Sequence, residues 1–192
     1  MKVLIAYSSV HHKNTEKVAK AMAKACNADL VDVVELEEKK LDNIEKYDLI
    51  GFGSGIYGGK PHKSMEELLE NLPVAEGTMA FVFSTSTFQK NKYNEAMAEK
   101  LIEKGYQVYE GFSCKGWNSF GPFKIVGGKD KGRPSQEDLY DAQQYVKRFV
   151  DAYEYEQSKA TPKEMESSFD KIAKKIKQSA KEAELVGEQN EL

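Results

Sequence analysis

The strongest constraint in this sequence is the regular alternation of short apolar runs with segments whose apolar residues recur every three or four positions. The apolar runs cover residues 2–7, 30–36, 47–52, 79–83 and 106–112. Runs of this length are typical of buried strands, and the segments between them have the spacing of helices. Five strands that alternate with helices predict an α/β fold, a doubly wound parallel sheet covered by helices on both faces.

Composition narrows the class of protein. Hydrophobic residues make up 40% of the 192 residues, which is enough for a core, and no apolar run approaches the length of a membrane span. The net charge of -3 gives no basic field for nucleic acid. Two cysteines are too few for a disulfide framework. We therefore expect a soluble, cytoplasmic protein that binds neither membranes nor nucleic acids.

The chain continues beyond the last expected core helix, which runs from about 136 to 153. Residues 154–192 carry nine acidic residues and seven lysines, and Thr161-Pro-Lys-Glu164 has the pattern of a helical capping box. We expect a domain over 1–153 and a charged helical extension over 154–192. The apolar stripe of that helix indicates packing on the domain or in a homodimer.

Polar residues gather where the first, third and fourth expected strands end. In parallel sheets, ligands bind beyond the carboxyl ends of the strands. The first strand is followed by Ser8-Ser-Val-His-His-Lys-Asn-Thr15 and then by a helix, whose free N–H groups favour a phosphate. Asn14 or Thr15 could instead only cap the helix.

These residues resemble the phosphate loop of the flavodoxin family. Tyr7-Ser-Ser9 and Asn14-Thr-Glu-Lys-Val-Ala19 match the family pattern, and His11-His-Lys13 departs from it. The resemblance implies a five-stranded sheet of order 2-1-3-4-5 that binds flavin mononucleotide (FMN). Lys13 would then add positive charge near the phosphate, and either histidine could line the ligand.

The resemblance also assigns the next two strand ends. Gly53-Ser-Gly-Ile-Tyr-Gly-Gly59 would be a glycine-rich loop beside the flavin ring, with Tyr57 in contact with the ring. Ser84-Thr-Ser-Thr87 would contact the pyrimidine edge of the ring, or one of its hydroxyls could be a helix cap. The irregular segment 112–123 supplies Trp117 or Phe120 as a cover for the flavin or as a docking surface.

Fifteen residues are expected to contact the cofactor, and no metal ligands or catalytic side chains are expected. They are Ser8, Ser9, His12, Lys13, Asn14, Thr15, Ser54, Gly55, Ile56, Tyr57, Gly58, Thr85, Ser86, Thr87 and Trp117.

The implied function is an electron carrier that exchanges electrons with redox partner proteins. An alternative is an FMN-dependent oxidoreductase that oxidises NAD(P)H and reduces a small acceptor such as a quinone. A non-redox binding module is a third reading. Lys115, Lys124, Lys129, Lys131 and Arg133 form a basic rim that could meet an acidic partner, bind a pyridine nucleotide phosphate, or be a solvated turn. Cys114 has no Cys-x-x-Cys partner, so a redox thiol is not expected.

Overall fold

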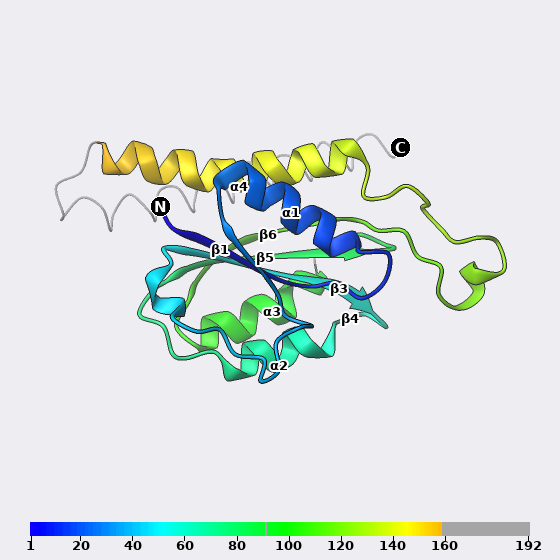
Figure 1. Cartoon of the computed structure of the whole chain (residues 1–192), viewed down its shortest axis with the longest axis horizontal. Helices are drawn as coiled ribbons and strands as arrows, with labels where there is room; N and C mark the ends of the chain where they lie inside the picture. The colour runs from blue at the N-terminus through cyan, green and yellow to red at the C-terminus, as the bar shows by residue number, and fades with distance from the viewer. Residues whose placement is uncertain (91, 159–192) are drawn as a thin grey trace. The chain divides into compact units, whose positions relative to one another are not determined.

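The computed structural model describes residues 1–90 and 92–158. Within this described part of the chain, a sheet of six strands is flanked by four helices, with two short 3-10 turns in the connections (Figure 1). In chain order the elements are β1 (Val3–Ser8), α1 (Asn14–Cys26), β2 (Asp29–Asp32), η1 (Ile44–Lys46), β3 (Leu49–Tyr57), β4 (Lys60–Pro61), α2 (Lys63–Asn71), β5 (Met79–Ser86), α3 (Lys92–Glu103), β6 (Gln107–Lys115), η2 (Gly121–Lys124) and α4 (Gln136–Gln157).

The strand order confirms the predicted α/β topology. The order is β2-β1-β3-β5-β6 with all of these strands parallel, and the two-residue β4 pairs antiparallel with the end of β3. Without β4 this is the order 2-1-3-4-5 that the resemblance to the flavodoxin family implied. The helix α1 and the part of α4 up to Arg148 lie over one face of the sheet, and α2 and α3 lie over the other (Figure 1). The carboxyl ends of the strands therefore share one edge, which lies at the right in Figure 1.

The larger apolar core lies between the sheet and the helices α2 and α3. Residues that alternate along the strands point to this face, as the period of two requires. They include Ile50, Phe52, Ala80 and Val82 from β3 and β5. The helices contribute Met65, Leu68, Leu69, Met97 and Leu101, which are at most 1% exposed.

On the opposite face, two glycines of β3 make room for two aromatic rings of β5. Gly51 pairs with Phe81 and Gly53 with Phe83 in the parallel ladder. A Cβ atom at Gly51 would lie 2.4 Å from Phe81 Cζ, and one at Gly53 would lie 2.0 Å from Phe83 Cζ. The Phe81 ring in turn contacts the Tyr145 ring of α4, with 5.5 Å between centroids.

The prediction of a glycine-rich loop over 53–59 is therefore wrong for the first five of its seven residues. Residues 53–57 continue β3, because Gly53 and Ser54 are held by β1 on one side and by β5 on the other. Only Gly58 and Gly59 form the turn, with φ angles of 61° and 87° that glycine adopts at low cost. The strands β5 and β6 also run about three residues further than predicted, to Ser86 and Lys115.

The second strand is shorter than predicted. It ends at Asp32, because the Asp32 carboxylate accepts a hydrogen bond of 3.0 Å from the N–H of Val34 and the chain turns there. The apolar residues from Val33 to Leu36 thus belong to a turn and the connection after it. Val33 is nevertheless fully buried in the core under this connection.

The chain divides into two compact units, Met1–Arg148 and Phe149–Leu192. The predicted boundary after residue 153 and the predicted dimer contact remain predictions. The helix that we expected from Thr161 lies outside the described residues.

The glycine–phenylalanine contact yields a stability prediction. Gly53→Ala should lower the free energy of unfolding by about 1–3 kcal/mol, because the new methyl group overlaps the buried Phe83 ring. Urea unfolding followed by circular dichroism measures the change. In a Phe83→Leu background, the same substitution should cost less, since the ring that it strikes is gone. An equal cost in both backgrounds would contradict a steric origin.

Candidate functional site

A cavity of about 320 Å³ opens at the carboxyl edge of the sheet. It lies where β1, β3, β5 and β6 lead into their connections, so its walls come from four separate stretches of the chain. Its lining consists of His11, Asn14, Thr15, Gly55, Ile56, Tyr57, Gly58, Thr85, Ser86, Thr87, Gly116, Trp117, Asn118 and Phe120. A cavity of this size with apolar walls and a few convergent polar groups is suited to a small ligand.

The N-terminus of α1 borders the cavity. His12 and Lys13 adopt left-handed backbone angles, with φ of 54° and 53°, and the helix begins at Asn14. Lys13 occupies the N-cap position and makes no side-chain capping hydrogen bond. Because neither Asn14 nor Thr15 is the capping residue, the interpretation of these side chains as simple caps is wrong. The first N–H groups of α1 have no partner within the helix, and together with the helix dipole they favour an anion.

The Lys13 side chain does not provide a free positive charge here. Its Nζ atom lies 3.3 Å from a Glu16 carboxylate oxygen, and Lys20 Nζ lies 2.5 Å from the other oxygen. The hydrogen bond from Lys20 is the main cause that lowers the pKa of Glu16. Glu16 is 9% exposed, so the first turn of α1 carries a buried carboxylate flanked by two lysines.

Asn14 and Thr15 are buried and oriented by other segments of the site. The Asn14 amide donates a hydrogen bond of 2.9 Å to the Trp117 carbonyl, which leaves the amide oxygen buried without a hydrogen-bond partner. The Thr15 hydroxyl is 2.8 Å from the Thr85 hydroxyl on β5. Both side chains are thus held in place, and the Asn14 oxygen is a free acceptor beside the cavity.

Trp117 forms one apolar wall of the cavity. The His12 ring stacks on it at 3.7 Å between centroids with an interplanar angle of 18°. His12 Nε2 is in turn 2.6 Å from the Ser119 hydroxyl. A Cβ atom at Gly128 would lie 2.3 Å from Trp117 Nε1. Only glycine at this position lets the loop backbone pack against the indole ring.

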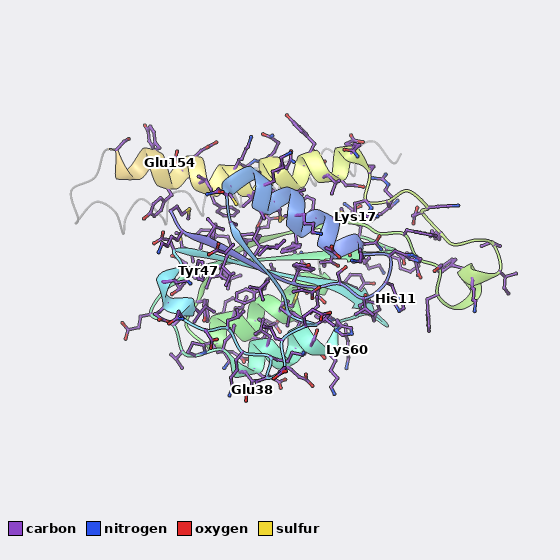
Figure 2. The ribbon with its side chains drawn as sticks, in the orientation of Figure 1. His11, Lys17, Glu38, Tyr47, Lys60 and Glu154 are labelled. Carbon is purple, nitrogen blue, oxygen red and sulfur yellow. The ribbon has the colours of Figure 1, made fainter. Side chains whose placement is uncertain are left out.

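Tyr57 forms a second wall, at the end of β3. Its ring lies 5.7 Å from the His11 ring and 5.4 Å from the His62 ring, between centroids. The His11 N–H donates to the Tyr57 hydroxyl at 3.4 Å. His11 is labelled in Figure 2, at the carboxyl edge of the sheet. Burial lowers the pKa of His62, which favours its neutral form at neutral pH.

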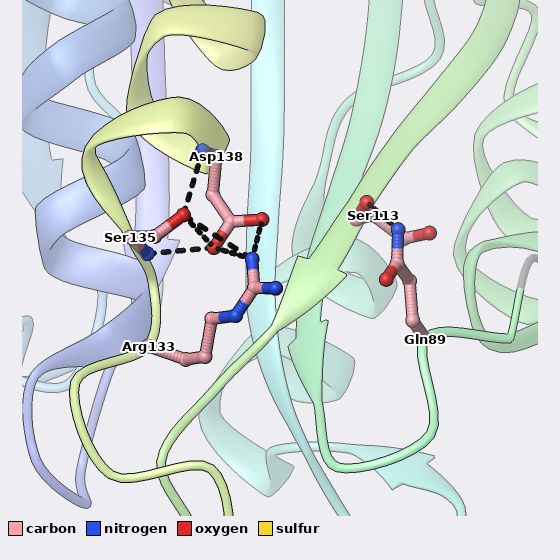
Figure 3. A network of polar contacts seen from close by, with 5 residues as sticks. All are labelled: Gln89, Ser113, Arg133, Ser135 and Asp138. Carbon is pink, nitrogen blue, oxygen red and sulfur yellow. Dashed lines mark hydrogen bonds and ion pairs between the residues drawn. The ribbon is translucent and has the colours of Figure 1, made fainter.

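The segment after β5 is held by hydrogen bonds to its neighbours. The Thr87 hydroxyl accepts a bond of 2.9 Å from the Asn118 amide, and the Ser86 hydroxyl accepts one of 2.9 Å from the Gln89 N–H. The Gln89 side chain donates to the Ser113 carbonyl on β6 at 3.1 Å (Figure 3).

The loop from β6 to α4 is anchored where the helix begins. Arg133 Nη1 lies 2.7 and 2.6 Å from the two Asp138 oxygens, and the Ser135 N–H and hydroxyl also donate to Asp138 (Figure 3). The Asp138 N–H donates back to the Ser135 hydroxyl, which completes a capping box. Because the Trp117 N–H donates to the Arg133 carbonyl, this anchor also restrains the cavity wall.

The structure brings ten of the fifteen expected residues to the cavity lining. They are Asn14, Thr15, Gly55, Ile56, Tyr57, Gly58, Thr85, Ser86, Thr87 and Trp117. The other five do not line it. The Ser8 and Ser64 hydroxyls bond each other at 2.7 Å, and the Ser54 hydroxyl accepts from the His62 N–H at 2.8 Å. Ser9, His12 and Lys13 lie in the first loop, outside the lining.

Four lining residues were not among the fifteen. Either histidine could line the ligand by sequence, and the expected residues included His12. The structure brings His11 to the cavity instead. A doublet in a loop gives no signal of which ring points inward. Phe120 was considered only as an alternative to Trp117. Gly116 and Asn118 had no sequence signal beyond their nearness to Trp117. A Cβ atom at Gly116 would lie 2.8 Å from Asn14 Nδ2, so this glycine lets the first loop approach.

The described residues form a cavity that could bind a small ligand. They contain no cluster of three or more histidine, cysteine or acidic side chains that could hold a metal ion. Burial raises the pKa of the Cys114 thiol to about 12, so it is not a nucleophile at neutral pH. No helix in the described part of the chain has the length and apolar character needed to cross a bilayer.

Comparison with known proteins gives a family match. A profile described as a flavodoxin domain matches residues 4–116. An uncharacterised protein of Methanocaldococcus jannaschii is 43% identical over 152 residues, which cover 78% of this chain and 99% of that protein.

Solved structures agree on the fold. Oxidised Flavodoxin 2 from Bacillus cereus matches with a TM-score of 0.57 at 24% identity, over 79% of this chain and 99% of that one. The rubredoxin oxygen:oxidoreductase of Desulfovibrio gigas matches with a TM-score of 0.59 at 14% identity, over 76% of this chain and 34% of that one. At these identities the likeness concerns the fold alone.

The capping box at Asp138 predicts a pH-dependent contribution to stability. Burial alone would raise the pKa of the Asp138 carboxyl, but hydrogen bonds from Arg133 and Ser135 outweigh it, so this pKa lies below its ordinary value of 3.8. Asp138→Asn should therefore lower the free energy of unfolding by about 1 kcal/mol at pH 7. The difference from the wild type should vanish as the pH falls below the ordinary value and through the lowered pKa.

Urea unfolding from pH 7 down to pH 3 measures this difference. Asp141→Asn, on the same helix, is the matched control and should change stability little at either end. If Asp138→Asn lowers the free energy of unfolding by the same amount at every pH, the ionised Asp138 carboxylate is not the source of the stabilisation.

Proposed function

This chain belongs to the flavodoxin family, and from that premise we propose that it binds FMN in the cavity at the carboxyl edge and transfers electrons. The observation that carries the proposal is the convergence of three features on one cavity of about 320 Å³. These are the uncapped N-terminus of α1, the aromatic walls of Tyr57 and Trp117, and the polar segment at the end of β5.

The residues present fit the chemical parts of FMN. A phosphate fits the first turn of α1, where N–H groups lack intrahelical partners and no side chain caps them. The buried, unpartnered Asn14 oxygen requires a donor, and a ribityl hydroxyl would supply one. The flat, largely apolar ring fits between aromatic side chains such as Tyr57 and Trp117.

When bound, the flavin supplies the redox chemistry, and the chain supplies its position and surroundings. Trp117 and Tyr57 would exclude water from the ring faces. The N–H groups at the ends of β3 and β5 would meet the polar edge of the ring. The Asn14–Trp117 and Thr87–Asn118 hydrogen bonds join the walls to each other, so that the cavity is held in shape before the cofactor enters.

The site also explains how the phosphate could be held without a free lysine. Lys13 is paired with Glu16, so backbone N–H groups and the helix dipole would provide the main attraction. The protein is also expected to work in the cytoplasm, where its two free cysteines would remain reduced.

The first test is a titration of the cofactor-free full-length chain with FMN. We expect saturable binding with quenching of flavin fluorescence, because Trp117 lies in the cavity wall. Stopped-flow mixing of the loaded protein with NADPH or NADH then separates the two redox readings. A carrier should react slowly, whereas an NAD(P)H oxidoreductase should be reduced rapidly. Failure to bind FMN would contradict both the electron carrier and the NAD(P)H oxidoreductase.

Removal of the two anchored polar side chains should weaken FMN binding. Asn14→Ala combined with Thr15→Ala should reduce the binding free energy by about 2–4 kcal/mol, from lost hydrogen bonds and a loosened cavity wall. Isothermal titration calorimetry measures the affinity.

The double variant Asn71→Ala with Thr78→Ala makes the same two changes away from the cavity and should bind FMN normally. An unchanged affinity of the Asn14 and Thr15 variant would mean that the phosphate and ribityl chain lie elsewhere.

A further inference from the structure

The loop of residues 120–132, between β6 and α4, is both apolar and basic on its surface. Phe120, Ile125 and Val126 are 78%, 90% and 73% exposed. Three large apolar side chains so exposed within thirteen residues are not what a solvated turn needs. Such a group is typical of a surface that becomes covered by a partner.

The loop of residues 120–132 is positively charged, and no described carboxylate pairs with its lysines. Lys124, Lys129 and Lys131 form no ion pair with a carboxylate among the described residues. Lys129 Nζ lies 4.8 Å from the centroid of the Phe88 ring, and Lys131 Nζ lies 6.0 Å from that of Trp117. The one acidic residue of the loop, Asp130, has its Oδ2 atom buried.

This positive charge is local. The whole chain carries a formal charge of -3, whereas residues 120–132 hold three lysines and one aspartate, a formal charge of +2. The protein as a whole would therefore repel an acidic molecule, while this loop attracts one. A local patch of opposite sign orients an encounter more than it strengthens it.

The loop also adjoins the proposed flavin site. Phe120 and Trp117 line the cavity, and an isolated antiparallel bridge joins Lys129 of the loop to Asn118, which also lines it. In Figure 1 the segment projects from the carboxyl edge of the sheet, beyond the strand ends. A protein bound to the loop would thus lie beside the cavity.

We propose that the loop of residues 120–132 is the docking surface for a redox protein whose own docking face is acidic around an apolar centre. The inference rests on the proposed function, because it takes the cavity beside the loop to hold the flavin. The three lysines and the exposed apolar side chains of the loop complement such a face in charge and in polarity. A pyridine nucleotide would need its phosphates enclosed by converging groups, and an anionic membrane would not need the loop to adjoin the cavity.

The test measures binding of an acidic plant-type [2Fe–2S] ferredoxin to the full-length chain at low ionic strength, both without and with FMN. We expect saturable binding that weakens as salt is added. Lys124→Glu with Lys131→Glu should weaken it about tenfold or more, mainly through slower association. Ile125→Ser with Val126→Ser, which keeps every charge, should also weaken it.

The matched control is Lys2→Glu with Lys24→Glu, which changes the total charge equally at exposed positions outside the loop. It should leave the affinity within about twofold of the wild type, because screening limits distant charges. Thermal unfolding of each variant establishes that it is folded.

Three outcomes would overturn the proposal. They are no binding of the ferredoxin, an equal loss of affinity in the Lys124 and Lys131 variant and in the control variant, or equally tight binding of a basic cytochrome c. Lysine-dependent binding of NADPH or of anionic vesicles in place of the ferredoxin would also overturn it. Because docking is measured without FMN as well, ferredoxin binding by a chain that cannot bind FMN would retain the docking surface and reject the proposed function.

Discussion

The parallel ladder of β1, β3 and β5 is the constraint on which the rest of the molecule depends. It places Ser8 beside Ser54, and Ser54 beside Ser84, so three chain segments end side by side. Parallel strands require crossovers, and these bring every connection after a strand to the same edge. The cavity forms there because the ladder leaves its polar strand ends next to the start of α1.

The same ladder determines what the glycines of β3 do. Gly51 and Gly53 lack side chains because Phe81 and Phe83 of the neighbouring strand lie over them. They stabilise the sheet under α1 and α4 and do not form a ligand loop. The cavity instead uses the next residues along the strand, from Gly55 to Gly58, where β3 reaches the edge.

The edge of the sheet combines two kinds of surface. Inside the cavity, the Trp117 carbonyl holds the Asn14 amide and the Thr85 hydroxyl holds that of Thr15, while the Asn14 oxygen stays available to a ligand. Outside it, the loop of residues 120–132 presents exposed apolar side chains and lysines that form no ion pair among the described residues. A rigid interior beside an exposed, charged rim suits a bound cofactor that must communicate with a second protein.

The sequence by itself determined the fold class, because the periodicity of apolar residues is a local signal, and its polar strand ends indicated the edge at which the cavity lies. The strand order followed from the resemblance to the flavodoxin family. The sequence also selected Asn14, Tyr57 and Trp117, whose side-chain types and places after strands pointed to the cavity. Only the tertiary structure decided where each strand stops and which of two adjacent side chains, such as His11 and His12, faces the ligand. Strand ends depend on pairing with distant strands. The orientation of the two histidines depends on contacts with distant residues, because His11 meets the Tyr57 ring and His12 stacks on Trp117.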